Sequence, residues 1–586
     1  MKQKRSTSKV RSSRHDASIA AHTPVETAQP APACAPSDPT SAAFTPAPTL
    51  RLSWLNAERV LWIWAAIVAA CVVWQPLLLG FYYDDWALWV DGSTKGSPFS
   101  LTRLLFMNFT NPVRPGCLPG RFLGSSLFGP HPLLWQGALL LVNCAVAVSI
   151  VAAARALTQA RTPAGRTITA AAGLCWLLLP WNAAARFWSA LLPNTSMIAA
   201  QGFLCVLLVR GWAKNRPRPL AAGALYLWIC LSYEAFYLQW IPLILIGVVL
   251  WNAKRTALRP VLVSGIALIA AQGLAGLWFL YTKHAGYWTA MAVLPDWVGI
   301  ARRNLLNLAP SILQSLSEIS AEFVFCGLIV IAMWLVAHFR SFGSAADRPA
   351  VKTSALLAGI SVLGGLLSVV IYSLAGRTVT ATGVATRSMG VFNFWLIVAG
   401  AVLTTFTMER LSGAPRFVFA LALAGFGLCL AVGQVLRASD WVTAWSLQQK
   451  VLAEAPVSDF KRTEPDARII LVNPFDVNGA PVFGEATDIN TAIPWAHPVL
   501  RQNFPQRLTS DEVRTFVHKD PRRRWIIVYN PWEGPMKWDG SQLSYAGQPP
   551  LETGAALYLW SPPDRSFWRP AGPFVINQNL TVEPAQ

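Results

Sequence analysis

The sequence has few charged residues for its length. Aspartate, glutamate, lysine and arginine make up only 13% of its 586 residues, whereas soluble proteins carry about 25%. Hydrophobic residues reach 54%, and the mean hydropathy is +0.40. A series of ordinary soluble domains is therefore excluded, and most of the chain is expected to face lipid or other apolar helices.

Several sequence motifs are also absent. There is no G-x-G-x-x-G and no P-loop, so nothing indicates a nucleotide site. There is no C-x-x-C, and most of the nine cysteines fall inside apolar runs, where cysteine acts as a small hydrophobe. Cys117 stands alone in the expected first outer loop. The sequence thus predicts neither a disulfide framework nor a zinc site, and its sparse histidines are not grouped with acids as metal ligands.

The chain carries a net charge of +19, which raises the question of nucleic-acid binding. Its basic residues collect in short loops between apolar runs, and no soluble segment shows a basic stripe with interleaved aromatics. Such loops follow the positive-inside pattern of membrane proteins. We therefore expect no nucleic-acid partner.

The apolar runs predict an all-α polytopic membrane bundle with about eleven transmembrane helices. Residues 1–52, rich in Ala, Pro, Ser and Thr, are expected to form a disordered cytoplasmic tail. The membrane domain is expected over 53–436. Its predicted spans are 59–80, 132–154, 167–186, 195–212, 219–233, 235–251, 260–281, 320–338, 354–375, 389–408 and 416–436.

The loops between the spans predict the orientation. With the N-terminus inside, the inner loops at 155–166, 214–218, 254–259, 340–352 and 410–416 all carry basic residues. The outer segments are then the long first loop 81–131, the loops 282–319 and 376–388, and the region 437–586. We therefore expect an inner-membrane protein with a cytoplasmic N-terminus and a periplasmic C-terminal domain.

The C-terminal region 437–586 has a different pattern. Short β-rich runs at 468–473, 525–529 and 556–560 are bounded by Pro and Gly, as strands are. Residues 511–518 are compatible with a short helix. This pattern predicts a small soluble α/β domain.

The stretch Phe81-Tyr82-Tyr83-Asp84-Asp85-Trp86 directly follows the first span. Two adjacent carboxylates at a membrane interface are costly unless they are solvated, paired or used in chemistry. Neighbouring side chains diverge on either a strand or a helix, so one Asp is expected to face a reaction centre and the other to anchor the loop. Alternatively, both cap a short interfacial helix.

This layout resembles the GT-C superfamily of membrane glycosyltransferases, which includes protein O-mannosyltransferases and lipid A aminoarabinose transferases. The resemblance covers the Asp pair after the first span, the multi-span body and the outer C-terminal domain. It implies an inverting transfer of a sugar from a polyprenyl-phosphate carrier. Asp84 or Asp85 would act as the general base, and Tyr83 and Trp86 would line a cleft or orient the loop. Some members use a divalent cation and others do not, so the need for a metal stays open.

A departing phosphate needs a cation nearby, and the planar fork of arginine binds two phosphate oxygens. We favour Arg387, in the short loop before a late span, and then Arg114, which is flanked by Pro and Gly. Glu234 at the outer end of a helical hairpin either orients the acceptor, pairs with an Arg, or caps the next helix. The other candidates on the predicted outer face are Arg121, Arg186, Arg302, Arg303 and Arg377.

The expected acceptor is a cell-envelope glycan, glycolipid or protein. A transporter or flippase of lipid-linked sugars is an alternative, but such proteins usually place ionisable groups near the bilayer midplane. The predicted span interiors instead hold Gln201, Gln239 and Gln272 with almost no acids or bases. A polysaccharide polymerase or ligase, and a non-catalytic relative of the fold, are further alternatives.

Overall fold

The computed structural model describes the chain in two stretches, a membrane part and a C-terminal part. In the membrane part it describes residues 57–455, apart from gaps at 95, 110–112, 160–161, 286–295, 318–320, 343–347, 375 and 382. In the C-terminal part it describes 468–472, 475–484, 486–496, 536–538, 542–545, 551–552, 556–561, 564–568, 574–576 and 582–584. The predicted disordered tail 1–52, the predicted helix 511–518 and the predicted strand 525–529 lie outside the described residues.

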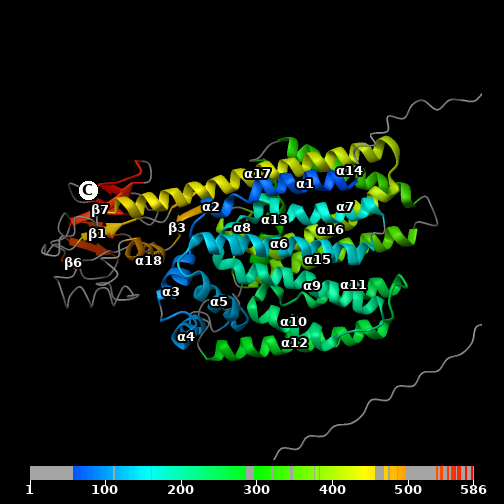
Figure 1. The fold of residues 1–586 in the computed structure, drawn as a ribbon, viewed down its shortest axis with the longest axis horizontal. Helices are drawn as coiled ribbons and strands as arrows, with labels where there is room; N and C mark the ends of the chain where they lie inside the picture. Colours follow the sequence, from blue (N-terminus) through cyan, green and yellow to red (C-terminus); the bar gives the residue numbers. More distant parts are fainter. Residues whose placement is uncertain are drawn as a thin grey trace, which may run out of the picture. The chain divides into compact units, whose positions relative to one another are not determined.

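Long helices make up the membrane part (Figure 1). They are α1 (Ala57–Val72), α6 (Pro132–Thr158), α7 (Pro163–Cys175), α9 (Leu192–Ala213), α10 (Pro219–Ser232), α11 (Trp240–Asn252), α12 (Leu258–His284), α13 (Trp297–Ser317), α14 (Ala321–Phe342), α15 (Arg348–Leu374), α16 (Gly390–Arg410) and α17 (Gly413–Glu454).

Each predicted span corresponds to helical structure, but not every one is a full-length straight span. Among the described residues, nine helices are long and apolar enough to cross a membrane. The prediction 167–186 is a bent pair, Pro163–Leu178 and Pro180–Phe187, with an angle of 62°. The prediction 219–233 is α10, whose 14 residues are too short for the same criterion. The chain is a multi-pass membrane protein, as predicted.

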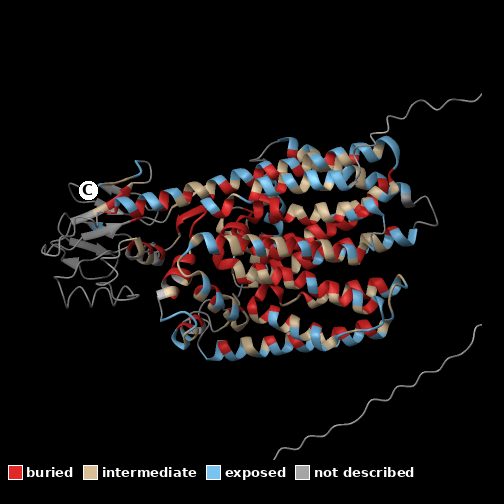
Figure 2. Ribbon diagram, viewed as in Figure 1, coloured by how far each residue is buried: buried red, intermediate tan, exposed pale blue. Residues whose placement is uncertain are grey.

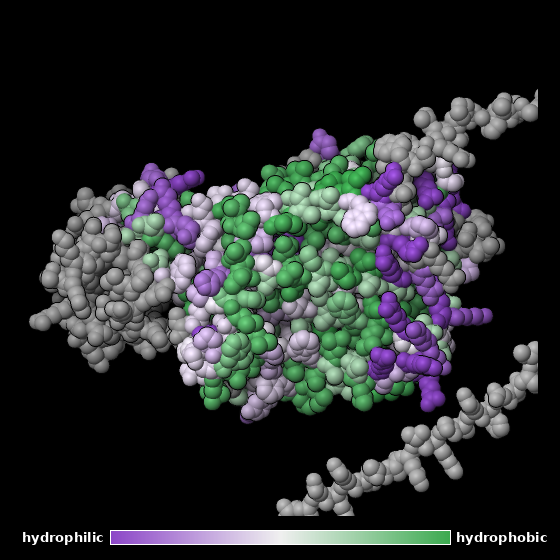
Figure 3. Space-filling model, viewed as in Figure 1, coloured by the Kyte–Doolittle hydropathy of each residue, from purple (hydrophilic) through white to green (hydrophobic). Residues whose placement is uncertain are grey.

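The surface of the bundle is apolar where it would face lipid. Figure 3 shows a hydrophobic band across this face of the molecule, with hydrophilic side chains on either side of it and most of them at the right-hand end. Figure 2 shows buried residues where helices pack together and exposed ones on the outer helices. In the span that contains α16, 78% of the most apolar 18-residue stretch is buried, whereas in α14 the buried share is 11%. Helix α16 is therefore central in the bundle, and α14 is peripheral.

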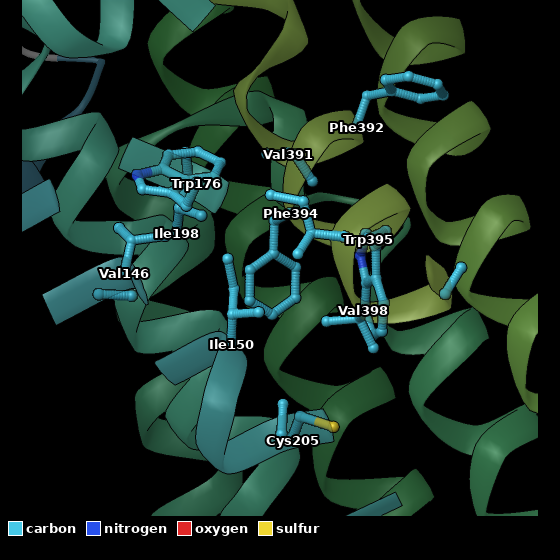
Figure 4. Close-up of a cluster of buried hydrophobic side chains, with 14 of the residues drawn as sticks. Val146, Ile150, Trp176, Ile198, Cys205, Val391, Phe392, Phe394, Trp395 and Val398 are labelled. Atoms are coloured by element: carbon cyan, nitrogen blue, oxygen red, sulfur yellow. The ribbon is translucent and has the colours of Figure 1, made fainter. Parts of the chain in front are cut away.

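The core is built where α6, α9 and α16 meet (Figure 4). Ile150, Ile198 and Phe394 are buried there, together with Trp395. The indole N–H of Trp395 donates to Oε1 of Gln239 at 2.6 Å, and the Gln239 amide donates to the Gly364 carbonyl at 3.0 Å. A polar atom buried among apolar helices is costly unless it is bonded, and this chain of bonds satisfies both side chains.

The turns that carry the predicted inner basic residues share one end of the bundle. Figure 1 places the α6–α7, α9–α10 and α11–α12 turns together at its right-hand end. The first loop lies at the opposite end and is folded into short elements: α2 (Gln75–Leu78), η1 (Trp86–Asp91), α3 (Gly92–Thr94), α4 (Leu101–Phe109), η2 (Pro115–Cys117) and α5 (Leu118–Phe128). The connection from α7 to α9 is similarly broken into η3 (Trp176–Leu178), η4 (Pro180–Asn182), α8 (Ala183–Phe187) and η5 (Ser189–Leu191).

The predicted boundary between the membrane domain and the C-terminal domain, at 436–437, falls inside the continuous helix α17. The helix continues because Trp441, Leu447 and Val451 are buried at helical spacing against the first loop and the C-terminal strands. The hydroxyl of Tyr82 donates to the Trp441 carbonyl at 2.7 Å. Helix α17 therefore connects the C-terminal region rigidly to the segment that carries the Asp pair.

The C-terminal region contains strands, as predicted. Strand β1 (Arg468–Leu471) pairs in parallel with β7 (Ala556–Ser561), which pairs antiparallel with β8 (Ser566–Trp568). Strands β2 (Phe475–Val477) and β3 (Ala480–Phe483) form a hairpin, followed by α18 (Ala486–Ala496). A five-stranded sheet has the order β10-β9-β4-β5-β6, from β4 (Met536–Trp538), β5 (Gln542–Tyr545), β6 (Leu551–Glu552), β9 (Phe574–Ile576) and β10 (Val582–Pro584).

Candidate functional site

A cavity of about 790 Å³ lies where the first loop meets the α10–α11 hairpin and the ends of α12 and α15. Its lining includes two carboxylates and four guanidinium groups, and the lining residues from α12 are all apolar. The ionic lining residues are Asp84, Glu234, Arg114, Arg121, Arg377 and Arg387.

The Asp pair divides between this cavity and the protein interior. Asp84 lines the cavity and is partly exposed. Asp85 is fully buried and does not line it. This is the divergence expected for neighbouring side chains, with one Asp at a candidate reaction centre and the other inside.

Asp85 holds two segments together through backbone N–H groups. Its Oδ2 accepts from Tyr82 N at 3.0 Å and from Ser189 N at 3.3 Å, and its Oδ1 accepts from Ala190 N at 2.5 Å. Although Asp85 precedes η1, its side chain makes no capping hydrogen bond to η1; the Ser189 and Ala190 N–H groups from which it accepts are the first two of η5. Burial raises the pKa of the Asp85 carboxyl to about 8, against the opposing effect of the N–H donors.

Asp84 lies in the electrostatic field of a buried arginine. Arg121, in α5, is buried and lines the same cavity. Burial lowers the pKa of the Arg121 guanidinium, and the negative charge of Asp84 acts in the opposite direction. The loop carrying Asp84 is thus next to a cation at the cavity wall.

Arg114 and Glu234 form an ion pair across the cavity wall. Nε of Arg114 lies 3.0 Å from Oε1 of Glu234, and the guanidinium stacks 4.6 Å from the centre of the Tyr233 ring. Burial disfavours the Arg114 charge, yet Glu234 raises the pKa of Arg114 above its usual range. Among the sequence alternatives for Glu234, pairing with an Arg is the one present in the structure.

Close packing against α10 positions Arg114. The carbonyl of Gly116 accepts from the indole of Trp228 at 3.0 Å, and the Cys117 thiol donates to the Ser232 carbonyl at 3.0 Å. A Cβ on Gly116 would come within 2.9 Å of the Trp228 carbonyl, so only glycine fits. The lone cysteine of the first loop is therefore a packing and hydrogen-bonding residue.

We expect Glu234→Gln to lower the stability of the protein. The substitution leaves the mostly buried guanidinium of Arg114 facing a neutral amide, and losing a charged partner there should cost about 1–3 kcal/mol. Thermal unfolding in detergent, followed by tryptophan fluorescence, measures the shift. Glu454→Gln is the matched control, because the pair Lys450–Glu454 is exposed and its loss should change the midpoint little. Equal shifts in the two variants would contradict this prediction.

Arg387 reaches the cavity from η7 (Val384–Met389). The hydroxyl of Thr386 accepts from Ala184 N at 2.9 Å and donates to the Gly383 carbonyl at 2.8 Å, which fixes η7 against α8. The guanidinium of Arg387 lies 5.6 Å from the ring centre of Trp188. The contact of the Arg387 guanidinium with the Trp188 ring, together with the hydrogen bonds that hold η7, gives this side chain a defined position at the cavity.

Three other predicted arginines lie away from this cavity. Arg186 is buried in α8 and donates to Oε1 of Gln75 at 2.8 Å. Arg302 and Arg303 are exposed on α13, and Arg303 pairs with Asp296 at 3.4 Å. Arg121 and Arg377, named on sequence grounds without preference, do line the cavity.

The two aromatic neighbours of the Asp pair support the loop and do not line the cavity. Trp86 is fully buried, and its indole N–H donates to Oε1 of Gln448 in α17 at 3.1 Å. Tyr83 has a φ of +50° and places its ring 5.3 Å from that of Trp188. Sequence reasoning missed Trp188 and Tyr372, which line the cavity, because nothing in their local sequence marks them as site residues.

The apolar side of the cavity is formed by α12 and α15. Leu277, Phe279 and Leu280 line it from α12, and Ile371 and Leu374 from α15. Gly273 and Gly276 also line it, and a Cβ at either position would meet no atom within 4 Å. The glycines therefore leave open space along an apolar wall.

The described residues do not fit the divalent cation that the resemblance allows at the Asp pair. Both Asp85 oxygens face backbone N–H groups, so only Asp84 offers a carboxylate to the cavity there. Among the residues that the structure describes, no cluster of three His, Cys, Asp or Glu side chains could hold a metal.

No protein-family model matches the chain, and no curated protein matches it. Among solved structures, it is similar to the oligosaccharyltransferase of Archaeoglobus fulgidus in the apo form, with 10% identity, a TM-score of 0.38, and coverage of 85% of this chain and 75% of that chain. It is also similar to ArnT from Cupriavidus metallidurans bound to undecaprenyl phosphate, with 12% identity, a TM-score of 0.38, and coverage of 87% and 94%. The apo state of that ArnT gives the same identity and TM-score.

Proposed function

We propose that this chain is an inverting glycosyltransferase that moves a sugar from a polyprenyl-phosphate carrier to a cell-envelope glycan, glycolipid or protein. The observation that supports this most is a single cavity with a carboxylate, several arginines and an apolar wall at one end of a membrane bundle. By the positive-inside pattern of the opposite loops, that end is the periplasmic one.

The apolar wall suits the prenyl chain of the donor. Its leucine, isoleucine and phenylalanine side chains come from two membrane helices, and Leu277, Leu280 and Gly273 are exposed at the surface of α12. A lipid-borne substrate entering between α12 and α15 would keep its chain in the bilayer while its phosphate reached the arginines. The position of ionic groups at one end of an apolar wall matches an amphipathic substrate of this kind.

Asp84 is the residue that we assign as the general base. It would take the proton of the acceptor hydroxyl while that oxygen forms a bond to the anomeric carbon. The bond from that carbon to the phosphate oxygen breaks on the opposite face, and the electron pair leaves with the phosphate, so the configuration inverts. Asp85 anchors the loop instead, because both of its oxygens are occupied by backbone N–H donors.

The departing phosphate would be held by Arg387, with Arg377 beside it. Arg387 contacts the ring of Trp188 and has no carboxylate within ion-pair distance among the described residues, so its charge is available to an anion. Arg114 is already paired with Glu234. We therefore assign Arg114 to shaping the cavity and a secondary role in phosphate binding.

The test is a mass-spectrometric profile of the envelope glycans in a strain that lacks this chain. One sugar mass should disappear on deletion and return when the wild-type chain is supplied. An unchanged profile on deletion would contradict a transferase role. A profile restored by a variant that lacks both Asp84 and Arg387 would contradict the assigned site.

We expect Gly276→Leu to lower the transfer rate by about tenfold or more, which corresponds to ~1.4 kcal/mol of donor binding. The leucine side chain would fill the open space on the apolar wall that we assign to the prenyl chain. Recovery of the glycan at low expression measures the effect. Gly359→Leu is the matched control, because Gly359 on α15 has equally open surroundings but does not line the cavity. Similar rates for both variants would contradict the assignment of this wall.

A transporter of lipid-linked sugars is the second candidate. The buried charged side chains of the described membrane part are Asp85, Arg103, Arg121, Arg186 and Glu234. None of them lies in the middle of a span: four are in the loops at the cavity end, and Arg186 is next to the last residue of the bent pair. A transport path needs such groups near the midplane, so this arrangement favours chemistry at the membrane surface.

A further inference from the structure

A second cavity, of about 490 Å³, lies between α13 and the loop that follows α15. Its volume falls in the range of about 300–1,000 Å³ that is typical of small-molecule sites. It is adjacent to the first cavity: Arg377 lines the first one, while its neighbours Gly376 and Thr378 line the second. Only the loop that carries these three residues would therefore separate a molecule in the second cavity from the first cavity.

The loop wall of this second cavity is rigidly held. Gly376 has a φ of +69°, and its N–H donates to the Ser373 carbonyl at 3.0 Å, while Arg377 N donates to the Tyr372 carbonyl at 3.1 Å. These two bonds form a Schellman motif, which ends α15 with a glycine in the left-handed conformation. This wall therefore has a defined conformation without a ligand.

Asn304 of α13 fixes the distance between the two walls. Its amide nitrogen donates to the Ser373 hydroxyl and to the Arg377 carbonyl, both at 2.9 Å, and its amide oxygen accepts from Val379 N at 3.2 Å. Asn304 is buried, and both its amide nitrogen and its amide oxygen are hydrogen-bonded within the protein. It is therefore a structural residue, and the cavity walls beyond it carry the groups that can meet a ligand.

Helix α13 has separate apolar and polar faces. Val298, Leu305, Leu306 and Leu313 form an exposed apolar face suited to lipid. A different face points to the second cavity, with lining residues at helical spacing. These are Arg303, Asn307, Pro310 and Gln314.

The chemistry of the lining indicates a neutral ligand rich in hydroxyl groups. Amide and hydroxyl side chains both donate and accept hydrogen bonds, as sugar hydroxyls do. Arg303 is the single charged group among the described lining residues, and it is already paired with Asp296. The amides and hydroxyls that line the cavity besides Asn304 are Asn307, Ser311, Gln314, Thr378 and Thr380.

We propose that this second cavity binds a neutral sugar unit of the acceptor and thereby holds the acceptor beside the first cavity. The use of that sugar as an acceptor rests on the proposed function, whereas its binding does not. A sugar held here would present its neighbouring unit past Arg377 toward Asp84. The first cavity would then carry out the transfer, and the second cavity would select the acceptor.

The test is binding of neutral disaccharides to the purified full-length chain in lipid nanodiscs, followed by saturation-transfer NMR. Maltose, cellobiose and chitobiose are the probes, and glucose 6-phosphate is the anionic comparison. The wild-type chain should transfer saturation to at least one neutral disaccharide. The double variant Asn307→Leu/Gln314→Leu should bind it about tenfold more weakly, because the hydrogen bonds of two amide side chains to the sugar are lost.

Two further variants control for folding and location. Thr378→Val removes a hydroxyl from the loop wall and leaves α13 unchanged, and it should also weaken binding. Arg302→Gln on α13 does not line the cavity and should bind like the wild type. The proposal is overturned if no neutral disaccharide receives saturation, if only the sugar phosphate does, or if the Asn307/Gln314 and Thr378 variants bind as well as Arg302→Gln.

The same experiment separates this proposal from the transferase proposal. Asp84→Asn lies in the first cavity, so the variant should keep disaccharide binding while it loses glycan transfer in cells. Retained binding with an unchanged envelope profile would support the sugar site and contradict the transferase. Absent binding, with transfer that is lost in Asp84→Asn, would contradict the sugar site alone.

Discussion

Asp84→Asn is expected to abolish detectable glycan transfer and to leave the stability of the protein nearly unchanged. The amide keeps the size of the carboxyl group but cannot accept the proton of the acceptor hydroxyl, and loss of a general base typically costs about 10²–10⁴-fold in rate. Asp84 is partly exposed at the cavity, and an amide of the same size leaves no void there. The measurement is the envelope glycan profile at matched membrane abundance, together with the thermal unfolding midpoint.

The neighbouring substitution Asp85→Asn is the control, because it makes the same chemical change one residue away. Here we expect the stability of the protein to fall, whereas Asp84→Asn should leave it nearly unchanged. An amide nitrogen would face one of the N–H groups of Tyr82, Ser189 or Ala190, and two donors cannot bond each other. An unpaired buried N–H costs about 1–3 kcal/mol, so the unfolding midpoint should fall. If Asp84→Asn restores the wild-type glycan profile while Asp85→Asn is stable and inactive, the two roles are reversed.

The membrane helices could be predicted from composition, because a long apolar run has few structural alternatives. The length of α17 was not predicted, since hydropathy falls after residue 436 while the helix continues to Glu454. Its continuation could have been found from Trp441, Gln448 and Val451, which repeat on one helical face and are all buried. The turn at Asn478-Gly479 was a further unused signal, since Asn-Gly between two apolar runs predicts a tight hairpin.

The candidate site could be predicted only in part. The divergence of the two aspartates follows from local geometry, but which one faces the cavity depends on the N–H groups of Ser189 and Ala190 in a distant segment. Arg387 and Arg114 were predicted from their loop positions, and both line the cavity. Arg186 does not, because Gln75 holds it inside the bundle. Tertiary contacts of this kind leave no local pattern.

Two glycines of the C-terminal region pack directly on the segments that carry Asp84 and Arg387. In the hairpin of β2 and β3, Gly479 places its carbonyl 2.8 Å from where a Cβ on Gly383 would lie, just before η7. After β3, Gly484 lies so close to the ring of Tyr83 that its own Cβ would overlap that ring. The C-terminal region therefore supports both sides of the candidate site, and a side chain at either contact would push on it.

Gly484→Val is accordingly expected to lower glycan transfer by about 10²-fold, since a displacement of about 1 Å at a reacting group can cost that much. The valine must displace the Tyr83 ring, which also packs against the ring of Trp188, and Asp84 is the next residue. Transfer is measured at equal membrane abundance, and Tyr83→Ala is made alone and together with Gly484→Val.

Removing the ring makes room for the valine, so the double variant should transfer better than Gly484→Val alone, and the two effects should not add. Additive losses would mean that Gly484 acts through the C-terminal region without reaching Tyr83. A wild-type rate in Gly484→Val would mean that the position of Asp84 does not depend on this contact. Recovery in the double variant would instead make Tyr83 the residue through which the C-terminal region positions the proposed base.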